Sequence, residues 1–121
     1  MVNRALLISL FLCVSVSHAQ EYEKTGEILE LVSAENSSGS PNGNLGAVYV
    51  EGFSSAGSCY VAGATGVVLI RLRDNDQGKF HSSMALTAFS TGKKVQVRVD
   101  DTNKDQYGAC YLKQIRLNKG F

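Results

Sequence analysis

Hydrophobic and polar residues alternate most cleanly over residues 94–99, where every second residue is a valine and the residues between them are Lys, Gln and Arg. A strand with one buried and one solvent-facing side has this two-residue period. Branched apolar residues predict further strands over residues 27–32, 47–51, 67–72 and 109–117, and residues 59–61 are expected to extend the sheet. In the strand predicted over residues 27–32, neither face is wholly apolar or wholly polar. Glu27 shares one face with Leu29 and Leu31, and Glu30 lies among apolar residues on the other.

A four-residue spacing of apolar side chains replaces the alternation over residues 79–91, which contain neither Gly nor Pro and predict a helix. Asn75 or Asp76 is suited to cap its start, and Gly92 is suited to end it. The face expected to pack on the sheet consists of Phe80, Met84, Ala85, Ala88 and Phe89. Leu86 lies outside this arc, which leaves two interpretations: a single exposed apolar residue, or a second contact with a neighbouring subunit.

Two polar segments separate these elements and predict loops. Residues 36–46 are dense in Ser, Asn and Gly and hold the single proline, and residues 100–108 are polar throughout. The resulting order is three strands, one helix and two strands. This is the order of a five-stranded OB-like barrel, mainly β, in which the helix between the third and fourth strands seals one end.

The first 19 residues are typical of a secretory signal peptide. Arg4 precedes an almost wholly apolar stretch, and Ser17 and Ala19 place small residues before the expected cleavage point. The apolar stretch is too short to span a membrane, so no stable membrane insertion is expected. Residues 20–121 then form a single domain, secreted or periplasmic, of a size that one core can just stabilise.

Charge narrows the class of partner. The chain holds 12 Lys and Arg against 11 Asp and Glu, and removing Arg4 with the signal peptide leaves a balanced count. A nucleic-acid binder would show a basic excess to displace counterions from phosphates. Glycans or other proteins are therefore the expected partners.

Two cysteines remain after the signal peptide, Cys59 and Cys110. Secretion into an oxidising compartment predicts that they form a disulfide. A metal-binding or reactive thiol would need a nearby histidine or second cysteine, and neither is visible in the sequence.

The sequence predicts no catalytic residues, no metal and no cofactor. His81 is the single histidine after the signal peptide, and we expect it on the helix surface without a carboxylate partner. The acidic segments 74–78 and 101–105 have oxygen ligands at alternate positions, but the twelfth positions of the two would-be EF-hand loops are Ala85 and Leu112 rather than glutamate. Turn and capping chemistry accounts for both segments, and the protein is not expected to be an enzyme.

Residues 88–97, with the sequence AFSTGKKVQV, resemble the helix-to-strand junction of secreted bacterial toxin B subunits of the subtilase cytotoxin and pertussis-like type. The chain also resembles small secreted bacterial proteins of unknown function that have this junction and a late cysteine. The resemblance implies an OB-type barrel, and toxin subunits of this group form ring-shaped pentamers that bind surface glycans. This chain has fewer cysteines and no counterpart to their sugar-contacting serine motif, so no glycan-binding residue is carried over.

Two function classes follow from the sequence. The first is a secreted, non-enzymatic binding module whose loops contact a glycan at the barrel rim, with a tyrosine ring stacking on a sugar face. The candidate ligand-binding residues are Asn42, Asn44, Asp101, Asn103 and Tyr107. The second is a periplasmic or secreted structural or interaction protein without a small-molecule ligand, and either class is compatible with a homo-oligomer.

Overall fold

The protein is mainly β with one helix. The structure is a computed structural model that describes residues 20–33 and 44–121. Its strands are β1 (Glu21–Val32), β2 (Asn44–Val50), β3 (Ile70–Arg73), β4 (Lys94–Lys104) and β5 (Cys110–Arg116), and the helix α1 (Asp76–Thr91) stands between β3 and β4.

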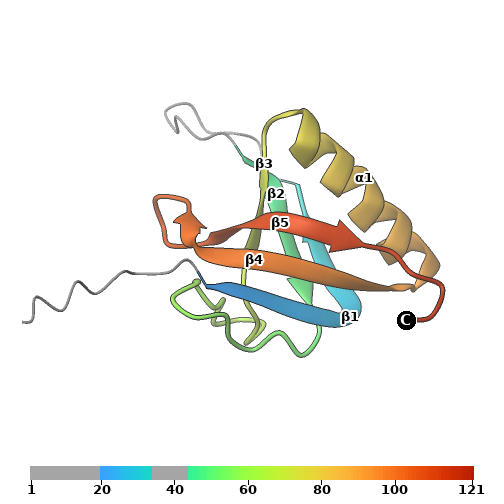
Figure 1. The fold of residues 1–121 in the computed structure, drawn as a ribbon, viewed down its shortest axis with the longest axis horizontal. Coiled ribbons are helices and arrows are strands. Elements are labelled where there is room, and N and C mark those ends of the chain that lie inside the picture. Colours follow the sequence, from blue (N-terminus) through green and yellow to red (C-terminus); the bar gives the residue numbers. More distant parts are fainter. Residues whose placement is uncertain (1–19, 34–43) are drawn as a thin grey trace, which may run out of the picture.

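The five strands form one sheet that closes in a ring (Figure 1). Hydrogen bonds join them in the order β1, β2, β3, β5, β4, and β4 pairs back with β1. Every neighbouring pair is antiparallel except β3 and β5, whose parallel ladder starts at Ile70 and Cys110. The parallel pair is possible because α1 and β4 provide the long connection between β3 and β5.

The main core lies inside the ring. Val95, Val97 and Val99 are fully buried there, which confirms the inner face predicted for residues 94–99. The helix α1 contacts all five strands and contributes Ala85 and Ala88 to the same core. Burial of this apolar surface is the main stabilising contribution in a domain of this size.

A bulge in β1 explains its imperfect alternation. The register of β1 against β2 shifts between Ile28 and Glu30. The extra residue reverses the alternation, so that Ile28 and Leu31 both pack on the inner core although three positions separate them, while Leu29 is exposed. A strict period of two therefore assigned the faces of residues 27–32 incorrectly.

The loop between β2 and β3 forms a second, smaller core on the outer face of β2. Ala47 and Tyr49 of β2 are buried against Ala62 and Val67 of this loop. The expected strand over residues 59–61 is wrong, because Val61 makes only an isolated bridge with Val68 and the segment runs as a covering loop. β3 accordingly begins at Ile70 rather than at residue 67.

Three strands are longer than their apolar patterns predict. β1 starts at Glu21, while β2, from Asn44, and β4, to Lys104, extend into segments expected to be loops. The polar start of β1 pairs with β4 from Glu21 opposite Asp100 onward, and Lys104 at the end of β4 pairs with Cys110 of β5. Arg98 forms ion pairs with Glu21 and Glu23 across the β1–β4 ladder. Backbone pairing and cross-strand charges extend the sheet here, and neither leaves a hydrophobic alternation to detect.

The predicted end of α1 at Gly92 is confirmed, whereas the helix begins at Asp76, three residues before the predicted range of 79–91. Of the two residues suited to cap its start, Asn75 is the N-cap, and its side-chain oxygen accepts a hydrogen bond from the Gly78 N–H at 2.8 Å. At the other end Gly92 adopts a left-handed conformation with φ 66°. The N–H groups of Gly92 and Lys93 donate to Phe89 and Ala88, the two hydrogen bonds of a Schellman motif.

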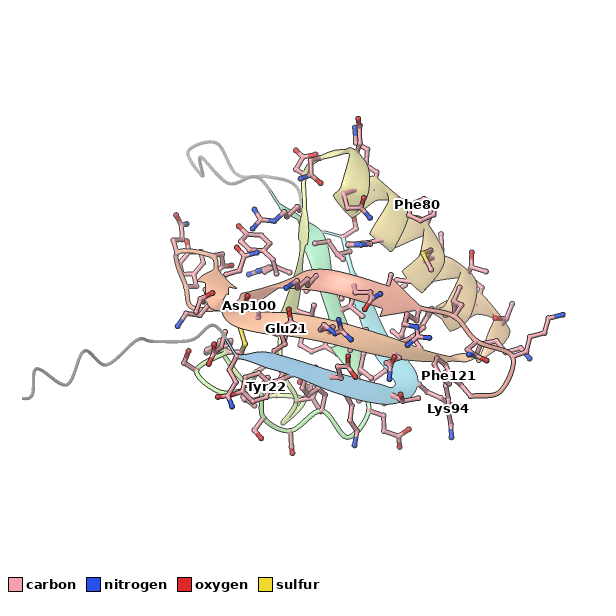
Figure 2. All side chains as sticks on the ribbon, in the orientation of Figure 1. Glu21, Tyr22, Phe80, Lys94, Asp100 and Phe121 are labelled. Carbon is pink, nitrogen blue, oxygen red and sulfur yellow. A yellow bond between two sulfur atoms is a disulfide. The ribbon has the colours of Figure 1, made fainter. Side chains whose placement is uncertain are left out.

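The packed face of α1 differs from the predicted one. Phe80 is 61% exposed and Phe89 46% exposed, and Figure 2 shows Phe80 pointing away from the sheet. The expectation that His81 lies on the surface is also wrong, since it is 7% exposed. Gly78 allows a close approach, since a Cβ there would lie 1.7 Å from the carbonyl oxygen of Arg73. The buried face of α1 therefore follows Gly78, with His81, Ala85 and Ala88 on the same side.

The predicted disulfide is confirmed. Cys59, in the loop between β2 and β3, is bonded to Cys110, the first residue of β5, and their Cα atoms are 5.3 Å apart. Figure 2 shows the disulfide bond on the side of the molecule where β5 begins. The bond ties the covering loop to the ring.

Candidate functional site

Two arginines on the outer face of β3 organise a polar cluster. Ile70 and Leu72 of this strand point into the core, so Arg71 and Arg73 point outward. Arg71 Nε donates to Asp105 Oδ2 at 3.0 Å, and Arg73 donates to Asn103 Oδ1 at 2.5 Å. Both acceptors lie at or just beyond the end of β4, so the arginines join β3 to the turn between β4 and β5.

Asp105 fixes the shape of that turn. Its Oδ1 accepts hydrogen bonds from the N–H groups of Tyr107 and Ala109, while its Oδ2 accepts from Arg71. The carboxylate is 7% exposed, and both of its oxygens accept hydrogen bonds. Tyr107 stands at the tip of the turn with 72% of its surface exposed. A rigid turn therefore presents an aromatic ring to solvent.

The ring of Tyr111 packs against the guanidinium of Arg73. The Arg73 Cζ lies 4.0 Å from the centre of the Tyr111 ring, a cation–π contact. Tyr111 is buried, and this burial raises the pKa of its hydroxyl, against the opposing effect of the Arg73 charge. We call Arg71, Arg73, Asn103, Asp105 and Tyr107 the polar rim.

A recess of about 240 Å³ lies beside the Arg73–Asn103 pair. Its walls come from the start of α1 and from β5 as well as from the polar rim. The lining consists of Arg73, Asn75, Gln77, Gly78, His81, Asn103, Leu112 and Lys113. Three carboxamides, an arginine, a lysine and an imidazole give this polar recess many hydrogen-bonding groups in a small volume.

His81 forms the buried wall of the polar recess. Its Nε2 lies 3.1 Å from Gln77 Nε2, and burial lowers the pKa of the imidazole. The neutral ring predominates at neutral pH, and it accepts a hydrogen bond from the Gln77 amide. The neighbouring Ser83 hydroxyl donates to the Lys79 carbonyl within α1. The contacts of these two side chains contain no nucleophile–base pair.

The predicted ligand-binding residues divide into two groups. Asn103 and Tyr107 both belong to the polar rim, and Asn44, the first residue of β2, pairs through its backbone with Arg73. Asp101 lies apart, since its Oδ1 accepts from the Gln20 N–H and its carbonyl from the Ser58 hydroxyl. Asn42 lies outside the described residues.

Sequence reasoning missed the residues that hold the rim together. Arginine and aspartate are common on protein surfaces, so Arg71, Arg73 and Asp105 do not stand out in the sequence. The residues that they contact lie about 30 positions away in the chain. One signal was present: two arginines occupy the outward positions of a short strand whose inward positions are apolar. Such a pair needs acceptors on a neighbouring element.

No group of three or more His, Cys, Asp or Glu residues within residues 20–33 and 44–121 is placed to hold a metal ion. In the same part of the chain, no helix is long and apolar enough to cross a membrane.

Comparison with known proteins found no family model, no curated protein and no solved structure that matches this chain.

Proposed function

We propose that this protein is a secreted, non-enzymatic binding module built on an OB-type barrel, and that it binds a glycan at the polar rim. The observation that carries the proposal is Tyr107, an exposed aromatic ring on a turn that Asp105 and Arg71 hold in one conformation. A sugar presents C–H groups that pack on such a ring and hydroxyl groups that hydrogen bond to planar polar side chains.

The polar recess supports the same proposal. Its carboxamides from Asn75, Gln77 and Asn103 offer both donors and acceptors, which suits hydroxyl groups. Preorganisation matters for such a ligand, because ordering a mobile loop would consume part of a modest binding free energy. In OB-type barrels the loop between the fourth and fifth strands commonly contacts oligosaccharides, and Tyr107 lies on that loop.

Secretion is supported by the Cys59–Cys110 disulfide, which persists in oxidising compartments. The signal-like segment 1–19 lies outside the described residues, so secretion is proposed on its sequence and on the disulfide. The resemblance to toxin B subunits supports a glycan ligand, although it supplies no residue of the proposed site.

The test is a glycan array probed with the oxidised protein comprising residues 20–121, followed by titration of any glycan that binds. We expect Tyr107→Ala to weaken binding by about tenfold or more, since stacked aromatic side chains commonly contribute over 1 kcal/mol. Phe80→Ala is the matched control, because Phe80 is an exposed aromatic residue on α1, outside the β4–β5 turn. Equal binding by the wild type and the Tyr107 variant would refute the site.

A second candidate function is an interaction protein that uses α1. Phe80, Leu86 and Phe89 are all exposed on this helix, and Leu86 is 58% exposed. Exposed aromatic residues are enriched at protein–protein interfaces. Light scattering after gel filtration tests the homo-oligomeric version: a mass of several chains that falls to one chain in Phe80→Ser/Phe89→Ser supports it, and a single-chain mass for the wild type opposes it.

A further inference from the structure

A second hollow lies well away from the polar rim, where the last turns of α1 meet the start of β4 and the chain beyond β5. Its volume is about 410 Å³, within the range typical of small-molecule sites. Ala88 and Leu117 line it together with Asn118 and three lysines, Lys93, Lys94 and Lys119. We call this hollow the lysine groove.

The floor of the lysine groove is apolar. Ala88 lies at its base with 1% of its surface exposed, so Leu117 is the apolar side chain that the groove exposes. Leu117 is 40% exposed although it follows a strand that otherwise buries its apolar residues. The Thr87 and Thr91 hydroxyls, which also line the groove, donate to the carbonyls of Ser83 and Thr87 within α1. Their protons are therefore already used, so these hydroxyls do not donate to an anionic group and leave that role to the lysines.

The rim of the groove carries only positive charge. All three lysines are exposed, and none takes part in the ion pairs among the described residues. Lys113, in contrast, is paired with Glu21. Glu27 is the register partner of Lys94 on β1, yet no ion pair joins them, and no Asp or Glu side chain lines the groove.

We propose that the lysine groove binds an anionic amphiphile, a medium-chain fatty acid, with its carboxylate among the three lysines and its hydrocarbon chain on Ala88 and Leu117. An inorganic anion would leave the apolar floor uncovered, and a neutral apolar ligand would leave the lysine charges without a counterpart. A bilayer surface fits less well, because the binding surface is concave. The site is separate from the proposed glycan site and does not depend on it.

The lysines also lie near the negative end of the α1 dipole, which by itself favours cations there. That effect stabilises the fold without any ligand. The experiment must therefore measure ligand binding and stability separately.

The test uses decanoate below its micellar concentration and 1-decanol as an uncharged probe of the same chain length. Calorimetry and amide NMR are run on the oxidised protein comprising residues 20–121. We expect saturable one-to-one binding of decanoate, with shifts centred on the amides of Ala88 and Leu117, and binding of 1-decanol weaker by about tenfold.

Variants assign the two parts of the groove. Lys93→Glu/Lys94→Glu/Lys119→Glu should weaken decanoate binding at least about tenfold, and Leu117→Asn should weaken both probes severalfold. Lys79→Glu, on the first turns of α1, is the matched charge control and should leave the affinity within about twofold. Thermal unfolding of each variant is recorded alongside, and Leu117→Asn keeps the test intact if the triple variant does not fold.

Three results would each overturn the proposal: no binding of decanoate to the wild type, equal affinity for 1-decanol, or amide shifts that map to the polar recess instead. If the lysines serve only the helix dipole, the triple variant will lose stability while the wild type binds no decanoate. Tyr107→Ala should bind decanoate normally, so failure of the glycan proposal leaves this one standing.

Discussion

Arg71 and Asp105, 34 residues apart in the sequence, are joined by a 3.0 Å contact from Nε to Oδ2 that fixes the β4–β5 turn to β3. Because the same carboxylate also accepts two backbone N–H groups of the turn, one side chain determines both the shape and the position of the loop that carries Tyr107. This contact is therefore the first to test.

Asp105→Ala should lower the free energy of unfolding by about 2 to 3 kcal/mol, because it leaves the Arg71 charge half-buried and two N–H groups without their acceptor. Chemical denaturation measures the change. Asp74→Ala removes an exposed carboxylate without a side-chain contact among the described residues and should alter stability by less than about 0.5 kcal/mol. Equal effects of the two variants would show that Asp105 does not hold the turn.

Replacing both cysteines, Cys59→Ala with Cys110→Ala, should destabilise the fold by about 4 kcal/mol. The bond spans 51 residues, and the estimate follows from the loop-closure entropy that the unfolded chain regains. Denaturant unfolding of the oxidised wild type and the double variant gives the difference. A loss under about 1 kcal/mol would mean that the unfolded chain is already compact between these positions.

Gly78→Ala should destabilise the protein by about 1 to 3 kcal/mol, although alanine normally strengthens a helix by about 1 kcal/mol over glycine. The reason is steric: the new Cβ would lie 1.7 Å from the Arg73 carbonyl oxygen and force α1 away from β3. Thermal melts compare it with Gly63→Ala, whose Cβ would meet nothing within 4 Å. A stabilised Gly78 variant would contradict the close approach.

His81 should make stability fall as the pH is lowered from 7 toward 5. Burial holds its pKa in the folded protein below the ordinary value of 6.5, so the unfolded chain binds the proton first. The stabilising contribution of the neutral imidazole is then fully present above pH 6.5 and is lost as the pH falls below this value. The free energy of unfolding decreases by at most about 1.4 kcal/mol per pH unit.

Urea unfolding at a series of pH values measures this dependence. His81→Gln removes the titrating group, so its stability should vary less between pH 7 and 5 whatever its absolute value. Parallel pH curves for the two proteins would show that other groups cause the change.

Local signals in the sequence determined several features correctly. The valines at 95, 97 and 99 assigned the inner face of β4, because a two-residue period follows directly from strand geometry. Asn75 and Gly92 marked the ends of α1, because capping depends only on a few neighbouring backbone groups. Two cysteines after a signal-like segment allowed a single intrachain pairing, and the structure contains it.

Tertiary structure decided the rest, because the contacts concerned join distant segments. The face of α1 depends on how closely Gly78 approaches β3, so His81 is buried and Phe80 is exposed against the apolar pattern. The bulge at Ile28 depends on pairing with β2. The polar rim exists only because the closed ring brings the β3 arginines to the end of β4, which no local period records.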